Sequence, residues 1–240
     1  NVEKGISMTK PQAVIIGVGD GLSAALARNL AEDYALTLAA RSADKLEALA
    51  SETGARTVQL DATDEDALAA LFDSLPAAPR VVIYNPSARV RGPIAELSAG
   101  DVRNAVEVTA IGAFLAGKHA ARHMLNAEPI EGTRGTILFT GASAGVKGFP
   151  QSAPFAMGKF AQRGLAESMA RELHPQNIHI GHFVIDGGIV KKSGDDRAAA
   201  RGDDGMLDPD AIAESYLQFH RQHRSAWAWE LEVRPWVEKF

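Results

Sequence analysis

The stretch that decides the fold is Gln12-Ala-Val-Ile-Ile-Gly-Val-Gly-Asp-Gly-Leu-Ser23, in which an apolar run ends in a glycine-rich turn. The apolar residues predict a buried strand, and the periodic pattern after Gly21 predicts an amphipathic helix. Glycine has no Cβ, so its backbone can approach a pyrophosphate whose charge then lies at the helix N-terminus. Strand, turn and helix in this order therefore predict a nucleotide-binding turn. The alternative is a turn whose glycines serve backbone geometry alone.

On either side of this turn, short apolar runs alternate with longer stretches of helical periodicity, which is typical of βαβ units and a parallel sheet. The predicted strands cover residues 12–17, 35–40, 56–60, 80–84, 136–140, 179–185 and 226–233. The predicted helices cover residues 21–33, 43–52, 64–74, 101–126, 154–173 and 209–221. Because βαβ crossovers are right-handed, these helices should cover both faces of the sheet. The sequence therefore predicts a doubly wound, mainly parallel, seven-stranded α/β sheet of the Rossmann-like type.

Length and composition predict one domain that acts on a small molecule. A chain of 240 residues, of which 46% are hydrophobic, can bury one large core. The net charge is −5 and the basic residues are scattered, so the electrostatic footprint of a nucleic-acid partner is missing. There is no cysteine, and no apolar run approaches the roughly 18 to 20 residues that cross a bilayer. We expect a soluble, cytoplasmic protein without a nucleic-acid or membrane partner.

Two segments depart from the regular pattern. Residues 1–7 precede a plausible native start at Met8 and carry no periodicity, so we interpret them as a cloning remnant and residues 8–240 as the single domain. Residues 191–208 are charged and poor in large apolar side chains, which predicts a mobile excursion from the domain. This excursion is either a solvated loop or a lid over the site, and the sequence leaves both interpretations open.

Several motifs together resemble the short-chain dehydrogenase/reductase family from Gln12 onward. The turn is similar to the family's Gly-x-x-x-Gly-x-Gly turn, with Gly17 and Gly21 matching and Ser23 in place of the last glycine. Asp61 looks like the family's adenine-contacting acid, and Asn85 looks like part of its Asn-Asn-Ala-Gly segment. A carboxylate that caps the next helix and an ordinary Asn-Pro turn are the structural alternatives. The predicted cofactor-binding residues are Gly17, Gly19, Asp20, Gly21, Leu22, Arg41, Asp61, Ala62, Asn85, Pro86, Ser87, Lys159, Gly187 and Ile189.

The end of the second predicted strand indicates which dinucleotide is bound. A carboxylate there selects NAD through the ribose hydroxyls, whereas a basic residue pairs with the 2′-phosphate of NADP. Ala40 stands at the position of the acid and Arg41 follows it, so NADP is favoured. Asp20 argues for NAD, because some NADP-dependent relatives carry a basic residue just before the second glycine. NAD therefore stays an alternative cofactor.

The resemblance also implies a catalytic set, which this chain carries in part. In the family a Tyr transfers a proton to or from the substrate oxygen, and a Lys four residues later lowers the pKa of that phenol and binds ribose. Lys159 is in place, but Phe155 occupies the Tyr position. The family's Ser falls on Ala142, so Ser143 is a candidate only with a local bulge. The Asn position holds Thr109. The candidate catalytic positions are Lys159, Ser143, Phe155 and Thr109.

Two functions of different classes follow from this partial set. The first is an NADP-preferring short-chain oxidoreductase that acts on a carbonyl or alcohol. The second is a dinucleotide-binding module with little or no turnover, used in sensing or assembly. By resemblance we expect a homodimer or homotetramer built on the long helices at 106–124 and 154–173. His119 and His123 favour helix packing over a metal site, and Tyr84 favours an aromatic wall over a catalytic phenol.

Overall fold

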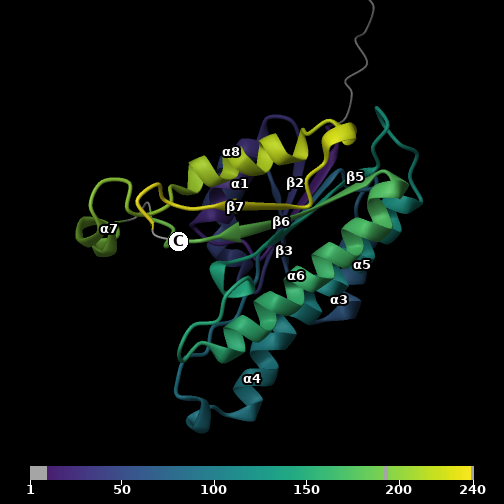
Figure 1. Cartoon of the computed structure of the whole chain (residues 1–240). Coiled ribbons are helices and arrows are strands. Elements are labelled where there is room, and N and C mark those ends of the chain that lie inside the picture. Colours follow the sequence, from purple (N-terminus) through teal and green to yellow (C-terminus); the bar gives the residue numbers. More distant parts are fainter. Residues whose placement is uncertain (1–9, 192–193, 239–240) are drawn as a thin grey trace, which may run out of the picture.

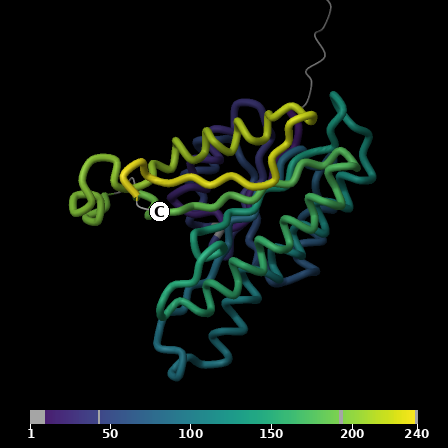
Figure 2. The backbone as a smooth tube through the Cα atoms, viewed as in Figure 1, coloured from purple at the N-terminus to yellow at the C-terminus, as the bar shows by residue number. Residues whose placement is uncertain are grey.

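The computed structural model describes residues 10–191 and 194–238, and the proposed remnant at residues 1–7 lies outside the described residues. Seven parallel strands form one sheet in the order β3-β2-β1-β4-β5-β6-β7, which confirms the predicted α/β architecture. The strands are β1 (Gln12–Ile16), β2 (Ala35–Ala40), β3 (Arg56–Gln59), β4 (Val81–Tyr84), β5 (Gly135–Thr140), β6 (Ile178–Ile185) and β7 (Glu230–Val233). Figure 2 shows the yellow C-terminal segment running alongside the green segment that contains β6.

Helices cover both faces of this sheet, with α1 and α8 on one face and α3, α5 and α6 on the other (Figure 1). The longer helices are α1 (Leu22–Ala31), α2 (Glu47–Thr53), α3 (Glu65–Asp73), α4 (Ala99–Val106), α5 (Gly112–Leu125), α6 (Ala153–Leu173), α7 (Asp196–Arg201) and α8 (Pro209–His220). The short helical turns are η1 (Ala43–Leu46), η2 (Ile94–Glu96), η3 (Glu107–Ile111), η4 (Ser143–Gly145), η5 (His174–Gln176) and η6 (Arg224–Ala226).

The alternation of side chains along each strand divides the core into two layers. In β1, Ala13 and Ile15 join the cluster beneath α1 and α8, whereas Val14 and Ile16 join the cluster beneath α3, α5 and α6. Successive side chains of a strand point to opposite faces, so a continuous apolar run fills both layers at once. This explains why the central strands read as unbroken apolar runs in the sequence.

The helix predicted at 101–126 is interrupted where it passes the end of β4. Its middle segment η3 is a π-helix, and the Tyr84 hydroxyl donates a 2.5 Å hydrogen bond to the carbonyl of Val108 within that segment. A π-turn leaves a carbonyl available to a side chain, and Tyr84 takes it. Burial raises the pKa of Tyr84 far above its ordinary value, so this phenol stays protonated within the core.

One strand boundary differs from the sequence prediction. The last strand begins at Glu230, because Ala226, the first residue of the predicted strand, belongs to the turn η6 that His223 caps. The helix predicted at 64–74 is α3, and its cap is Asp64, whose carboxylate accepts from the Ala67 amide at 3.0 Å. The charged excursion contains the short helix α7, which projects beyond the carboxyl end of β6 in Figure 1. Within the described residues, no helix is both long and apolar enough to cross a bilayer.

Candidate active site

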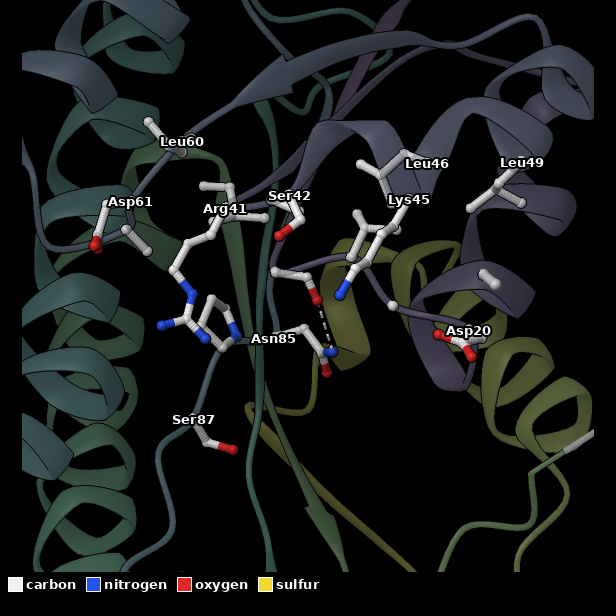
Figure 3. A pocket seen from close by; sticks show the side chains of 18 of the residues that line it. Asp20, Arg41, Ser42, Lys45, Leu46, Leu49, Leu60, Asp61, Asn85 and Ser87 are labelled. Carbon is white, nitrogen blue, oxygen red and sulfur yellow. Dashed lines mark hydrogen bonds between the residues drawn. The ribbon is translucent and has the colours of Figure 1, made fainter. Parts of the chain in front are cut away.

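A cavity of about 570 Å³ lies at the carboxyl ends of the central strands, where the strand order reverses between β1 and β4. Doubly wound sheets bind ligands at this switch point. Predicted cofactor residues from four different loops line this cavity (Figure 3). They are Gly17, Gly19, Asp20, Arg41, Asp61, Ala62, Asn85, Pro86 and Ser87. The other predicted cofactor residues, Gly21, Leu22, Lys159, Gly187 and Ile189, are described by the structure but lie outside the lining of this cavity.

The glycine turn is tight on one side and open on the other. Gly17 has a φ of +81°, and a Cβ there would lie 2.5 Å from the Pro86 ring. A Cβ at Gly19 or Gly21 would meet nothing within 4 Å. Gly21 gives α1 no side-chain cap, so the first amides of that helix are left for an anion. The turn therefore has the space and the donors that a diphosphate requires.

Ser23, at the position of the family's last glycine, joins this turn to the end of β4. Its hydroxyl lies 3.2 Å from the Gly17 carbonyl and accepts a 2.6 Å hydrogen bond from the Asn85 amide. The same Asn85 amide donates to the Gly17 carbonyl at 3.2 Å, the contact drawn as a dashed line in Figure 3. The side chains of Ser23 and Asn85 thus hold the glycine turn against the loop after β4. The sequence motif alone does not reveal this contact.

One wall of the cavity is cationic. Arg41 follows β2, and Lys45 reaches the same space from the turn η1 (Figure 3). Asp20 lies on the opposite side of the pocket in that view, and Arg28 is neutralised by Glu52 at 2.8 Å. Sequence reasoning missed Lys45 because it stopped at the strand end. The signal was a second basic residue four positions after Arg41, which a helical turn brings back to the same side.

Asp61 combines its predicted position with a local structural role. Its carboxylate accepts hydrogen bonds from the Thr63 amide at 3.0 Å and the Thr63 hydroxyl at 2.8 Å. These bonds, assisted by the charge of Arg41, lower the pKa of Asp61 below its ordinary value. Asp61 therefore faces the cavity as a carboxylate at neutral pH.

Lys159 is buried beyond this cavity, and only 2% of it is exposed. Its ammonium donates to the Thr140 carbonyl at 2.5 Å and to Gln162 Oε1 at 3.1 Å. Gln162 Nε2 in turn donates to the carbonyl of Thr109 at 3.3 Å, so one side chain joins Lys159 to the π-helical segment. Burial, with the nearby charge of Arg89, lowers the pKa of Lys159 to about 7. Gln162 was not found from the sequence, because only the folded contact shows its role.

Phe155 lies in an apolar cluster with Ala142 and Ala144 at the start of α6. The Lys159 ammonium lies 6.0 Å from the centre of the Phe155 ring. Ser143 opens the turn η4 between the two alanines and is half-buried. The residues that meet at the expected proton-transfer position are therefore a phenyl ring and methyl groups, neither of which exchanges a proton.

The Thr109 hydroxyl accepts a 3.2 Å hydrogen bond from the amide of Ala88. Thr109 is fully buried, and Gly158 lets α6 approach it closely, since a Cβ at Gly158 would lie 2.8 Å from Thr109 Cβ. The hydroxyl fixes the loop after β4 beside the start of α6. In this structure Thr109 thus positions backbone, and its carbonyl receives the Gln162 amide.

The segment after β6 is held by ion pairs of Asp186. Asp186 accepts from Lys147 at 3.5 Å and from Arg234 at 3.3 Å. Gly187 lies against Pro235, and the Ile189 carbonyl accepts from Arg197 at 3.2 Å. These contacts tie three loops together at the carboxyl end of β6.

The two histidines of α5 pack against α3. His119 stacks on Phe72 with ring centres 6.3 Å apart, and His123 lies 3.1 Å from the Asp73 carboxylate. Both rings therefore serve helix packing, as their spacing on the sequence favoured.

A fully parallel, doubly wound sheet with a glycine turn and a cavity at its switch point defines a Rossmann-type α/β domain. Residues 11–196 match the short chain dehydrogenase family. The chain therefore belongs to this family.

Individual relatives agree with this membership. A short-chain dehydrogenase from Rhodopseudomonas palustris is 34% identical, and its crystal structure matches 94% of this chain and 99% of its own with a TM-score of 0.79. Cis-4-hydroxycyclohexanecarboxylate dehydrogenase from Sinomonas cyclohexanicum is 33% identical over 66% of this chain, and the match spans 65% of that protein. The structure of BdcA in complex with NADPH is 25% identical, with a TM-score of 0.78 over 95% of this chain and 94% of that one.

Proposed function

We propose that the chain is an NADP(H)-preferring oxidoreductase acting on a carbonyl or alcohol of a small molecule. The observation that carries the cofactor preference is the pair Arg41 and Lys45 on one wall of the cavity, with Ala40 where an acid would bind the ribose hydroxyls. Two cations facing one space suit a phosphate of double negative charge. The NADPH of the BdcA complex and the alcohol named for the Sinomonas relative support the same assignment.

In this proposal the chain's own residues bind and orient the dinucleotide. The step that lacks its usual residue is the transfer of a proton to or from the substrate oxygen. The glycine turn and the first amides of α1 would hold the diphosphate, and Arg41 with Lys45 would hold the 2′-phosphate. A bound nicotinamide would supply or accept a hydride. Because Phe155 has no acidic proton, the proton on the substrate oxygen comes from water or from Ser143. A second candidate, a dinucleotide-binding module with little turnover, rests on the apolar contact of Phe155 with Ala142.

Fluorescence titration tests the cofactor preference directly. NADPH should bind at least about tenfold more tightly than NADH, because charge-assisted bonds to the extra phosphate exist only for NADPH. Arg41→Ala and Lys45→Ala should each weaken NADPH and leave NADH unchanged, so NADH is the internal control. Equal or tighter NADH binding, with both affinities unmoved by Arg41→Ala, would assign the preference to NAD and give Asp20 the larger influence. Failure to bind either dinucleotide would refute the proposed function.

We also propose that the chain forms a homodimer or homotetramer through the outer faces of α5 and α6. Exposed apolar side chains gather on these helices, among them Phe114, Met157 and Phe160. A groove of about 550 Å³ lies between the two helices and is lined by Phe114, Leu165 and Met169. Exposed apolar side chains beside an apolar groove are typical of a subunit contact.

Light scattering coupled to gel filtration tests the assembly. Phe114→Glu should shift the protein toward a smaller species, because a buried unpaired carboxylate opposes the contact. Ile94→Glu is the matched control, since Ile94 is 77% exposed on η2 and Phe114 is 47% exposed on α5. A monomeric wild type, or an oligomer that Phe114→Glu leaves intact, would contradict the assignment of this face.

A further inference from the structure

An arginine covers the residue that replaces the family's tyrosine. The Arg89 guanidinium carbon lies 4.4 Å from the centre of the Phe155 ring. Phe155 is buried, with 7% of it exposed, whereas Arg89 is partly covered and keeps an exposed surface. Stacking on a ring uses the flat face of a guanidinium and leaves its in-plane N–H donors for other partners. Within the described residues the Arg89 guanidinium makes no hydrogen bond, so its donors beside the Phe155 ring are open to another group.

The backbone on both sides of Arg89 is anchored. The Ala88 amide donates to the Thr109 hydroxyl at 3.2 Å, and the Gly92 amide donates to the Gln151 carbonyl at 3.1 Å. The same loop begins with Asn85, Pro86 and Ser87, which line the cavity. One short segment thus runs from the candidate cofactor cavity to Phe155, and Arg89 is held at its far end.

The charges around Arg89 are of the same sign. In the part of the chain that the structure describes, no carboxylate lies within 4.0 Å of the Arg89 guanidinium, and Arg91 and Arg197 are close enough to act on its charge. Arg197 is compensated by Asp195. Partial burial and these neighbouring cations lower the pKa of Arg89, and Arg89 in turn lowers the pKa of Lys159. An anion bound here would relieve this repulsion.

We propose that Arg89, stacked on Phe155, binds an oxyanion carried by the substrate, either a carboxylate or a phosphate monoester. That the bound anion belongs to a substrate rests on the proposed function. That Arg89 binds an anion at all rests on the contacts of Arg89 alone. A guanidinium with free in-plane donors matches both groups bidentately. The chain would then select acidic carbonyl or alcohol compounds over neutral ones of the same shape.

Calorimetric titration with benzoate, phenyl phosphate and benzamide tests the subsite, with and without saturating NADPH. The two anions and the neutral amide share one ring, so their difference reports the charge. In wild type at least one anion should bind about tenfold or more tightly than benzamide. Arg89→Gln should remove that preference, Arg89→Lys should retain part of it, and Arg103→Gln, which removes the same charge from the exposed surface of α4, should change nothing. The tighter anion identifies carboxylate or phosphate as the group.

Several outcomes would overturn the subsite. They are equal binding of benzamide and both anions, no anion binding at millimolar concentration, and an anion preference that survives Arg89→Gln. The NADPH titration separates this failure from that of the proposed function. Loss of anion preference in a chain that binds NADPH refutes only the role of Arg89, whereas anion binding at Arg89 in a chain that binds no dinucleotide refutes only the oxidoreductase. A circular dichroism spectrum of Arg89→Gln checks that the variant folds.

Discussion

Reduction of a carbonyl by NADPH should increase by about 10²- to 10⁴-fold when Phe155→Tyr is combined with Ala142→Ser. Phe155 and Ala142 belong to one apolar cluster, so a phenol and a hydroxyl introduced there would lie in the same small region. The Lys159 Nζ lies 6.0 Å from the centre of that ring, so its amine is near the position of a new phenol. The rise is the contribution expected of a positioned proton donor, measured as kcat/KM over a panel of neutral and acidic carbonyls.

The single variants separate the two functions that the site supports. Phe155→Tyr alone should give part of the gain if Ser143 reaches the substrate oxygen, and little of it if Ser143 does not. Phe155→Leu keeps the site apolar and supplies no phenol, so as the control it should not produce this gain. If wild type already turns over a substrate and Ser143→Ala lowers that rate, the chain has its own proton route and the added phenol should help little. Cofactor binding without reduction in every variant would favour the binding module.

The doubly wound parallel sheet could be predicted from the sequence because each strand is marked by its own residues. Apolar runs such as those in Gln12–Ile16 and Val81–Tyr84 fill both core layers, and this demand leaves a pattern within a single segment. The glycine turn is marked in the same way. Local demands on backbone shape or burial are therefore visible before any contact is known.

The chemistry that the sequence missed depends on contacts between distant segments. Lys45 reaches the cavity only because η1 turns back, Gln162 matters only because Thr109 lies opposite it, and Arg89 matters only because α6 brings Phe155 beneath it. No rule of residue spacing within one segment predicts these contacts. The π-helical segment is another example, because its contact with the Tyr84 hydroxyl on β4 joins two segments that are far apart in the sequence.

Stability should fall steeply as the pH decreases from about 6.5 to about 4, because buried histidines are neutral in the folded chain. His179 lies between Phe219 and Trp227, with ring centres 4.6 Å and 4.5 Å away, and its Nε2 lies 2.8 Å from the Ala228 carbonyl. Burial lowers the pKa of His179 to about 4. Burial, with the charges of Arg80 and Arg221, lowers the pKa of His220 to about 4 as well.

The sign follows from which state binds the proton. In the unfolded chain a histidine titrates near its ordinary value of about 6.5, so below that pH the unfolded state takes up protons that the folded state refuses. The stabilisation is complete above pH 6.5 and is lost as the pH falls toward the folded pKa of about 4. For His179 the loss is on the order of 3 kcal/mol. The pKa values of His119, His174 and His182 are also lowered by burial, which adds to the slope.

Urea unfolding followed by circular dichroism at a series of pH values between about 7 and 4.5 measures this slope. His179→Phe keeps a ring between Phe219 and Trp227 but cannot bind a proton, so its free energy of unfolding should depend less on pH, whatever its absolute stability. Gln218→Ala changes an exposed side chain that cannot bind a proton and should leave the slope unchanged. The pKa of Glu230, held by His182 and Arg163, is lowered to about 2, so the stabilisation from that carboxylate is still almost complete at the lower end of this range. Identical slopes for His179→Phe and wild type would show that the neutral ring of His179 is not what acid destabilises.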